Sequence, residues 1–202
     1  MKLVYKEVFK SNEQLPLGTL PENAVKFKEP KNLTETTIKA SLFALPALVG
    51  VALFIIGSRL LHGDLSINGT LPGMLFAFLT LIPHEFLHAI CFGRDAEVEL
   101  FIAPKQLSLF VISTQPITKA RFIILSLLPN IVFGWLPLAV WMVLPYSAFF
   151  SNHLLTFSVI SVLFGLGDYM NVYNAARQMP KGSMQQLSGF NSYWFLQKTS
   201  VS

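Results

Sequence analysis

Long apolar segments follow one another along most of the chain. Residues 40–58, 65–83 and 122–167 contain no Lys, Arg, Asp or Glu. A helix of about 20 apolar residues is long enough to span the hydrocarbon core of a bilayer. The pattern predicts about four transmembrane helices, at about 40–58, 70–92, 122–144 and 153–176, with the last two divided near Pro145-Tyr146-Ser147.

Residues 94–121 have a different pattern. Their apolar residues come in short runs rich in β-forming types, at 97–102 and 107–112, with Pro104-Lys105 between them. Such runs predict a β-hairpin, and they are too short and too interrupted to cross a bilayer as a helix. The expected fold is an all-α membrane protein with a β-hairpin over residues 97–112, between the second and third transmembrane helices.

The two ends of the chain are polar. We expect a loosely structured N-terminal arm over residues 1–39, with pieces that either lie on the membrane surface or fold against the core. A transmembrane core over 40–182 and a polar tail over 183–202 are expected to follow. The arm has no apolar stretch of the kind found in a cleavable signal peptide. The tail contains Tyr193-Trp194-Phe195, and such aromatic residues are enriched at membrane interfaces.

The composition also indicates a membrane protein. Of the 202 residues, 52% are hydrophobic and only 13% are charged, whereas soluble domains are about one-quarter charged. The net charge of +4 is spread thinly over several loops, so it does not indicate a nucleic-acid partner. The single cysteine, Cys91, excludes an internal disulfide.

The basic residues predict the orientation in the membrane. All of the 15 Lys and Arg residues except Arg59 lie in the N-terminal arm, in residues 94–121 or in residues 177–198, which follow the fourth span. Four spans place these three segments on one side, and basic residues favour the cytoplasmic side. We therefore expect a multi-pass protein of the cell membrane, with both termini and the hairpin in the cytoplasm.

Candidate chemistry lies near the end of the second span, where His84-Glu85-Phe86-Leu87-His88 reads H-E-x-x-H. Residues four apart share one face of a helix. His84 and His88 are therefore expected to bind one Zn²⁺ ion, with Glu85 as the general base beside it. Ionisable residues inside a membrane span are costly and usually functional. The plainer alternative is a helix end that carries solvated His and Glu side chains.

A hydrolytic zinc site needs a third protein ligand and one open position. Glu85, Asn130 and Asp168 each lie nine residues from the basic residue at the cytoplasmic end of their span. At 1.5 Å per residue, all three lie about 13 Å below the same membrane face. Asp168 is therefore the expected third ligand, with Cys91 and His153 as rivals.

Two asparagines in the third and fourth spans are further candidates. Asn130 is expected either to hydrogen-bond a substrate carbonyl or oxyanion or to form a hydrogen bond between helices. Asn171, about one turn beyond Asp168, is expected to support the metal ligands through a hydrogen bond or to pack between helices.

On these residues the sequence resembles the site-2 protease class of intramembrane metalloproteases. More closely, it resembles a bacterial family of membrane proteins described as zincin peptidases. The resemblance covers about residues 70–190 and rests on residues 84–88, on Ser126-Leu127-Leu128-Pro129-Asn130 and on Gly167-Asp168-Tyr169-Met170-Asn171. It implies zinc, peptide hydrolysis within the membrane, Glu85 as general base and Asp168 as third ligand. Tyr169 follows the aspartate where site-2 proteases carry Gly, and no Asn-Pro pair precedes it.

The residues predict an intramembrane zinc endopeptidase that hydrolyses peptide bonds of membrane-associated substrates through a metal-activated water. Its expected partners are the lipid bilayer and a membrane protein or peptide substrate. The hairpin is expected either to receive an unwound substrate by strand addition or to pack as a plug at the membrane surface. Two alternative functions are a membrane metal transporter or sensor, and a non-catalytic scaffold with a vestigial motif. The glutamate between the histidines favours hydrolysis, because a transporter needs no base there.

Overall fold

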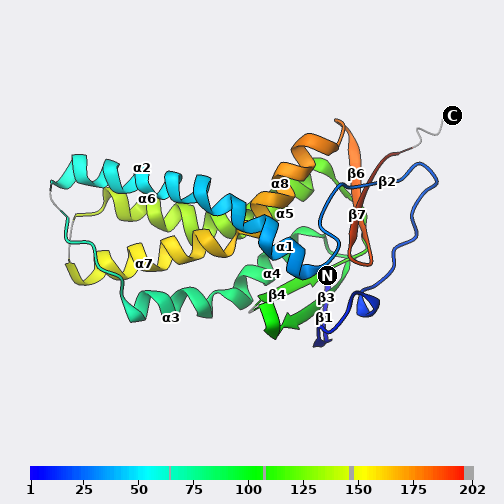
Figure 1. Ribbon diagram of the computed structural model, residues 1–202, viewed down its shortest axis with the longest axis horizontal. Coiled ribbons are helices and arrows are strands. Elements are labelled where there is room, and N and C mark those ends of the chain that lie inside the picture. The colour runs from blue at the N-terminus through cyan, green and yellow to red at the C-terminus, as the bar shows by residue number, and fades with distance from the viewer. Residues whose placement is uncertain (64, 107, 146–147, 198–202) are drawn as a thin grey trace.

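The computed structural model describes residues 1–63, 65–106, 108–145 and 148–197. The molecule is elongated, with long helices at one end and strands at the other (Figure 1). Its α-helices are α1 (Leu33–Ala40), α2 (Ala44–His62), α3 (Leu71–Leu79), α4 (Leu81–Cys91), α5 (Lys119–Asn130), α6 (Leu136–Val143), α7 (Ala148–Phe164) and α8 (Leu166–Gln178). Of the residues used in the sequence-based predictions, Leu107, Tyr146, Ser147 and Lys198 lie outside the described ranges.

Helical stretches long and apolar enough to cross a membrane occur in all four predicted regions. Three are continuous, at Leu33–His62, Leu71–Cys91 and Lys119–Val143. A fourth consists of Phe150–Phe164 followed by Leu166–Gln178, and these two helices are bent by 47° at the break between them. The third stretch contains a π-helical segment, Ile131–Trp135, between α5 and α6.

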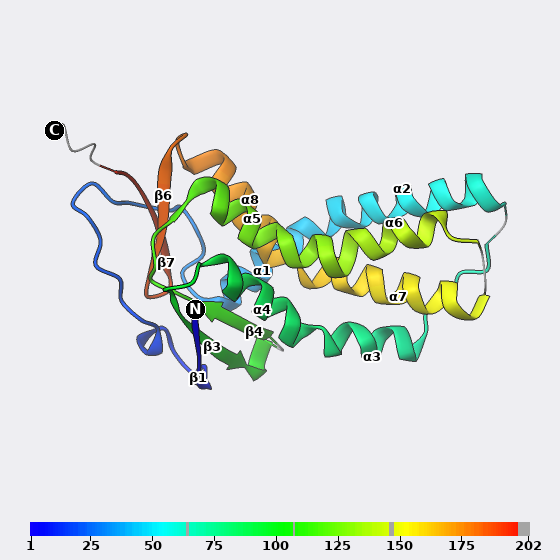
Figure 2. The same ribbon diagram turned by 180° about the vertical axis from the view of Figure 1, so that it is seen from behind.

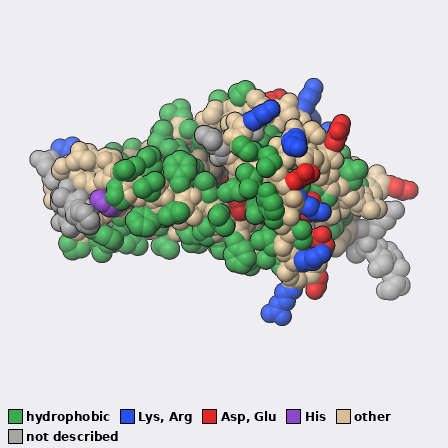
Figure 3. Space-filling model, turned by 90° about the horizontal axis from the view of Figure 1, so that it is seen from below, with side chains coloured by type: hydrophobic (Ala, Val, Ile, Leu, Met, Phe, Trp, Pro, Cys, Tyr) green, Lys and Arg blue, Asp and Glu red, His purple; other side chains and the backbone are tan. Residues whose placement is uncertain are grey.

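The surface of the helical end is apolar. Large aliphatic side chains are exposed along it, among them Leu45, Leu60 and Leu79. Figure 3 shows hydrophobic side chains over the helical part, whereas most Lys, Arg, Asp and Glu side chains gather at the strand end. An exposed apolar surface of this extent is typical of a membrane or protein interaction site.

Several helices begin directly after a capping side chain. Asn32, Thr70 and Thr118 stand just before α1, α3 and α5, and each accepts a hydrogen bond from the backbone N–H three residues further on. Such caps satisfy donors that have no partner within the helix. They also place the starts of α3 and α5 close to the predicted starts of the second and third spans.

The strands form two sheets. The first has the order β1-β3-β4, and the second has the order β2-β7-β6-β5. Their bounds are β1 (Lys2–Val8), β2 (Val25–Lys26), β3 (Glu97–Ala103), β4 (Ser108–Ile112), β5 (Ile117–Thr118), β6 (Ser183–Ser188) and β7 (Asn191–Leu196). Strands β3 and β4 pair antiparallel with Phe101 opposite Phe110, so a hairpin is present where the sequence predicted one. The predicted all-α class is incomplete, because it included only this hairpin.

The polar ends of the chain are folded. In the N-terminal arm, β1 pairs in parallel with β3, β2 pairs with β7, and α1 crosses the expected boundary at residue 39. Pieces of the arm therefore fold against the rest of the molecule, one of the two alternatives expected for them, and they are more ordered than the loose structure predicted for the arm as a whole. In the tail, β6 and β7 form a hairpin with Gly189 at φ 58° in its turn. Through these pairings, the strands cover α4, α5 and α8 at one end of the molecule.

Two of the three apolar clusters found among the described residues hold the helices together and join them to the strands. One lies among α2, α6 and α7 and includes Val51, Leu138 and Val162. The other joins the helices to the strands and includes Phe27, Ala89 and Phe122. The free side of β4 faces α4, which carries the H-E-x-x-H motif (Figure 2). The motif therefore lies where the helical end meets the strand end.

Candidate metal centre

The two histidines of the motif lie on one face of α4. His84 and His88 are 7% and 6% exposed, and their rings meet edge to face with centroids 4.9 Å apart. Ligand atoms of His84, Glu85 and His88 all lie within 4.8 Å of one another. The four-residue spacing produces this arrangement, because residues i and i+4 stand one above the other on a helix.

Asp168 comes from the first turn of α8 and lies between the two imidazoles. Its Oδ2 is 3.3 Å from Nε2 of His84, and its Oδ1 is 3.3 Å from Nε2 of His88. Two ligand atoms on a tetrahedral ion with bonds of 2.0–2.1 Å are themselves about 3.3 Å apart. Two imidazole nitrogens and one carboxylate also match the donor set of a hydrolytic zinc site. The residues therefore fit a zinc ion.

A hydrogen bond to the backbone orients the ring of His88. Its Nδ1 lies 2.8 Å from the backbone carbonyl oxygen of Leu125 in α5. A carbonyl only accepts, so Nδ1 carries the proton and Nε2 is directed to Asp168. A hydrogen bond of this kind sets the tautomer and orientation of metal-binding histidines.

Glu85 points to the strands. Its Oε2 accepts a hydrogen bond of 3.0 Å from the backbone N–H of Val111 in β4. This bond fixes the carboxylate beside the histidine pair. It also shows that the N–H of Val111 points away from β3, because β3 lies on the other side of β4.

Asn130 lies next to Asp168 and is fully buried. Its Nδ2 donates to Oδ2 of Asp168 at 2.8 Å and to the carbonyl oxygen of Ser126 at 3.1 Å. Asn130 is not among the residues that line the cavity at the site. Of the two expected roles, the hydrogen bond between helices is present in the structure.

Position relative to the cavity distinguishes the three remaining candidate residues. Asn171 lines the cavity about one turn beyond Asp168. Cys91 is the last residue of α4 and packs at the edge of the apolar cluster that contains Ala89. His153 lies in α7, where its carbonyl oxygen approaches Gly73 near the start of α3. Neither Cys91 nor His153 lines the cavity.

A cavity of about 490 Å³ opens onto the candidate ligands. Its wall includes segments that sequence reasoning did not assign to the site. Thr36, Thr37 and Ala40 come from α1, and Gln185 and Ser192 come from β6 and β7. The sequence could have indicated these wall residues only by their spacing. Thr36 and Ala40 are four residues apart, as on one face of a helix, and Gln185 and Leu187 are two apart, as on one face of a strand. Both signals are too common to indicate a site.

The family model described as "Putative zincin peptidase" matches residues 77–184, which is more than half of the 202-residue chain. The chain belongs to this family. The zincin peptidase match covers all three candidate ligands together with Glu85 and Asn130. It ends before Gln185 and begins after α1, so part of the cavity wall lies outside it. No curated protein and no solved structure matches the chain.

Proposed function

We propose that this protein is a zinc-dependent endopeptidase that cleaves membrane-associated substrates within the membrane. The observation that carries the proposal is the position of Asp168, whose two oxygens each face one imidazole of the H-E-x-x-H motif at 3.3 Å. Membership of the zincin peptidase family supports zinc-dependent proteolysis. The apolar helices around the site support a membrane location.

His84, His88 and Asp168 would hold the zinc ion, with one position left open. When bound, zinc supplies a Lewis acid that polarises the scissile carbonyl and makes a water molecule easier to deprotonate. The buried setting of the histidines keeps bulk water away from them. Electrostatic interactions are stronger in such a setting than in water.

Glu85 is the proposed general base. It takes a proton from water as the water oxygen bonds to the carbonyl carbon, and it gives this proton to the amide nitrogen as the C–N bond breaks. The products are a new carboxyl group and a free amine, so no other reactant is required. The bond from Val111 to Oε2 holds the carboxylate in place for both transfers.

The proposed orientation follows from charge. Among the described residues, the basic side chains other than Arg59 belong to segments on the side of the strands, and this side is the cytoplasm by the positive-inside rule. Both termini and both sheets would then be cytoplasmic. The metal ligands would lie a short distance inside the bilayer, at the depth where the helical end meets the strands.

The free edge of β4 is the proposed docking site for the substrate backbone. A transmembrane helix keeps its carbonyls in internal hydrogen bonds, so it must unwind before one can be attacked. An unwound segment regains hydrogen bonds by pairing with an exposed strand edge. Ser108, Leu109, Phe110 and Val111 line the cavity beside Glu85, so a paired segment would lie next to the base.

The test compares wild type with Glu85→Gln and with the surface variant Glu13→Gln as control. Zinc content is measured on the purified full-length proteins, and cleavage is measured by comparing the protein termini in membrane fractions of cells that express each variant. We expect Glu85→Gln to keep about one zinc per chain and to lose cleavage, because Glu85 is a base and not a ligand.

Other outcomes would contradict the proposal in distinguishable ways. Loss of zinc from a folded Glu85→Gln protein would make Glu85 a ligand. Metal transport that survives the substitution, without cleavage by wild type, would favour a transporter. Wild type that binds no metal would favour a scaffold.

A further inference from the structure

Asp168 stands at a break in the fourth helical stretch. Helix α7 ends at Phe164, α8 begins at Leu166, and the two are bent by 47°. Asp168 is therefore in the first turn after a bend, where the main-chain hydrogen bonds of one continuous helix do not hold it. Its orientation must be set by contacts from neighbouring elements.

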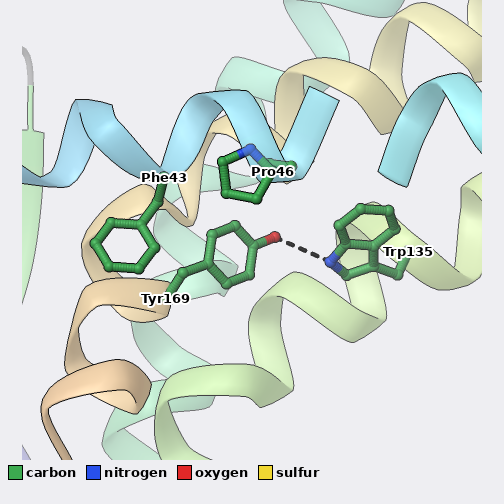
Figure 4. Close-up of a pocket in the computed structure, with 5 residues that line it drawn as sticks. Phe43, Pro46, Trp135 and Tyr169 are labelled. Carbon is green, nitrogen blue, oxygen red and sulfur yellow. Dashed lines mark hydrogen bonds between the residues drawn. The ribbon is translucent and has the colours of Figure 1, made fainter. Parts of the chain in front are cut away.

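Two side chains of the third stretch bind this first turn. Nδ2 of Asn130 donates to Asp168 at 2.8 Å, and Nε1 of Trp135 donates to the hydroxyl of Tyr169 at 3.0 Å. Figure 4 shows the Tyr169 hydroxyl directed at the indole nitrogen of Trp135. The same hydroxyl donates to the carbonyl of Val162 at 3.2 Å, so it connects α8 back to the last turns of α7 across the bend.

The π-helical segment explains how one helix makes both contacts. Asn130 and Trp135 are five residues apart, and in an α-helix each residue adds 100°, so they would point about 140° away from each other. The segment between them, Ile131–Trp135, is π-helical. Its hydrogen bonds run from residue i to i+5, and this wider turn brings such residues closer to one face. Asn130 and Trp135 can then reach two consecutive residues of α8.

Two glycines make room for the arrangement. A Cβ on Gly165 would lie 1.4 Å from Oδ1 of Asn130, so no other residue fits at the bend while Asn130 keeps its place. A Cβ on Gly134, inside the π-helical segment, would lie 2.8 Å from Cγ2 and 3.1 Å from the backbone nitrogen of Val162. The segment therefore packs directly on the backbone of α7, at Val162, whose carbonyl also accepts the hydrogen bond from Tyr169.

The geometry points to the π-helical segment as a device that positions Asp168, with Asn130, Trp135 and Tyr169 as positioning residues. This inference rests on the proposed zinc site, because it concerns the orientation of its third ligand. Asn130 directs the carboxylate so that each oxygen faces one imidazole. Trp135 and Tyr169 hold the turn that carries it. None of the three touches the substrate.

The experiment measures zinc affinity of the purified full-length protein by competition with a chromophoric chelator. The variants are Asn130→Ala, Trp135→Phe and Tyr169→Phe. Two controls lose comparable groups elsewhere: Trp141→Phe removes an indole that donates to Ser151, and Tyr173→Phe removes a hydroxyl one turn further along α8 that accepts from Arg177. The visible absorption of the Co²⁺-substituted proteins gives a second measurement, which reports ligand geometry directly.

We expect Asn130→Ala to weaken zinc binding by about 10–100-fold, the usual effect of removing a group that supports a metal ligand. Trp135→Phe and Tyr169→Phe should each weaken it severalfold. The double variant should be no weaker than Tyr169→Phe alone, because Tyr169→Phe already removes the hydrogen bond that Trp135→Phe removes. The Co²⁺ spectrum should change in all three variants. The two controls should keep the wild-type affinity and spectrum.

Unchanged affinity and spectrum in the three variants would overturn the positioning role and leave the proposed function standing. Wild type that binds neither metal would overturn the proposed function, and this inference with it. If Asn130→Ala does not fold, Tyr169→Phe decides, because it removes only one oxygen atom. Equal losses in Tyr169→Phe and Tyr173→Phe would show a general effect on α8 and would also overturn the inference.

Discussion

The backbone N–H of Val111 donates a 3.0 Å hydrogen bond to Oε2 of Glu85. Val111 lies in an edge strand, where successive N–H groups point to alternate sides. The N–H of Val111 points to α4, so that of Leu109 points the same way, and that of Phe110 points to β3. The free edge of β4 therefore already binds the candidate base, and Leu109 supplies the next outward donor along it.

Replacing this outward donor tests the substrate edge. Leu109→Pro removes an N–H that β3 does not use, and proline is tolerated on edge strands. We expect cleavage to fall at least about tenfold, the effect of losing one well-made hydrogen bond, with zinc content unchanged. Leu109→Ala keeps the N–H and serves as control. Equal cleavage by the proline and alanine variants would refute strand addition at this position.

Asp168→Ala should weaken zinc binding by more than about a hundredfold and remove cleavage, because it deletes a ligand rather than a supporting group. Cys91→Ala is the matched test of the rival ligand and should leave both unchanged. Zinc content by mass spectrometry of the purified proteins measures the difference. An Asp168→Ala protein that holds zinc as tightly as wild type, while Cys91→Ala does not, would place the third ligand on α4.

The stability of the strand end should depend on pH through Glu29. Burial raises the pKa of Glu29 from 4.5 to about 7, against the opposing effects of a hydrogen bond from the backbone N–H of Ser192 and the charge of Lys26. The folded state therefore binds a proton more tightly than the unfolded chain. This stabilisation is complete below pH 4.5 and is lost as the pH rises through about 7.

Glu29→Gln should remove this dependence. Between pH 5 and pH 8, we expect the Tm of wild type to fall relative to that of Glu29→Gln by at least about 2 °C, as about 1 kcal/mol does in a protein of this size. Glu22→Gln, an exposed residue of the same arm, should follow wild type at every pH. Parallel curves for wild type and Glu29→Gln would refute the assignment.

The proposed orientation is tested by labelling single cysteines in a Cys91→Ala background. A membrane-impermeant maleimide should label Lys105→Cys, between β3 and β4, only after intact cells are permeabilised. It should label Gly69→Cys without permeabilisation, because Gly69 lies before α3 at the other end of the second span, where an added Cβ meets open space. Labelling of Lys105→Cys from outside intact cells would invert the topology.

Local features of the chain were predictable from sequence. The helical stretches are long apolar runs, and such a run specifies a helix because lipid cannot satisfy backbone hydrogen bonds. The β3–β4 hairpin was predictable because two short runs of β-forming residues are separated by only a few residues. The spacing of His84 and His88 specifies a shared face of α4 through helix geometry alone. Counting from the end of its span predicted Asp168 beside the histidines, and its oxygens lie 3.3 Å from both imidazoles.

Other features depend on distant parts of the chain. Strand β1 pairs with β3 across about 90 residues of sequence, and a polar segment shows no sign of such a partner. The bend at Gly165 and the π-helical segment after Asn130 fit each other in space, yet neither sequence breaks the apolar pattern. The parts of the cavity wall that α1, β6 and β7 provide likewise form only when the N-terminal arm and the C-terminal tail of the chain fold over α4.

The sequence by itself determined which groups the candidate site brings together: two imidazoles and a carboxylate close to one another on one helix, with Asp168 supplied by another helical stretch. Helix periodicity and bilayer thickness are local constraints, so they can be read along the chain. Only the tertiary structure decided that Asn130 binds Asp168 and does not face the cavity, and that Glu85 meets the edge of β4. Side-chain direction depends on how helices rotate and pack against one another, and residue spacing within each helix does not contain that information.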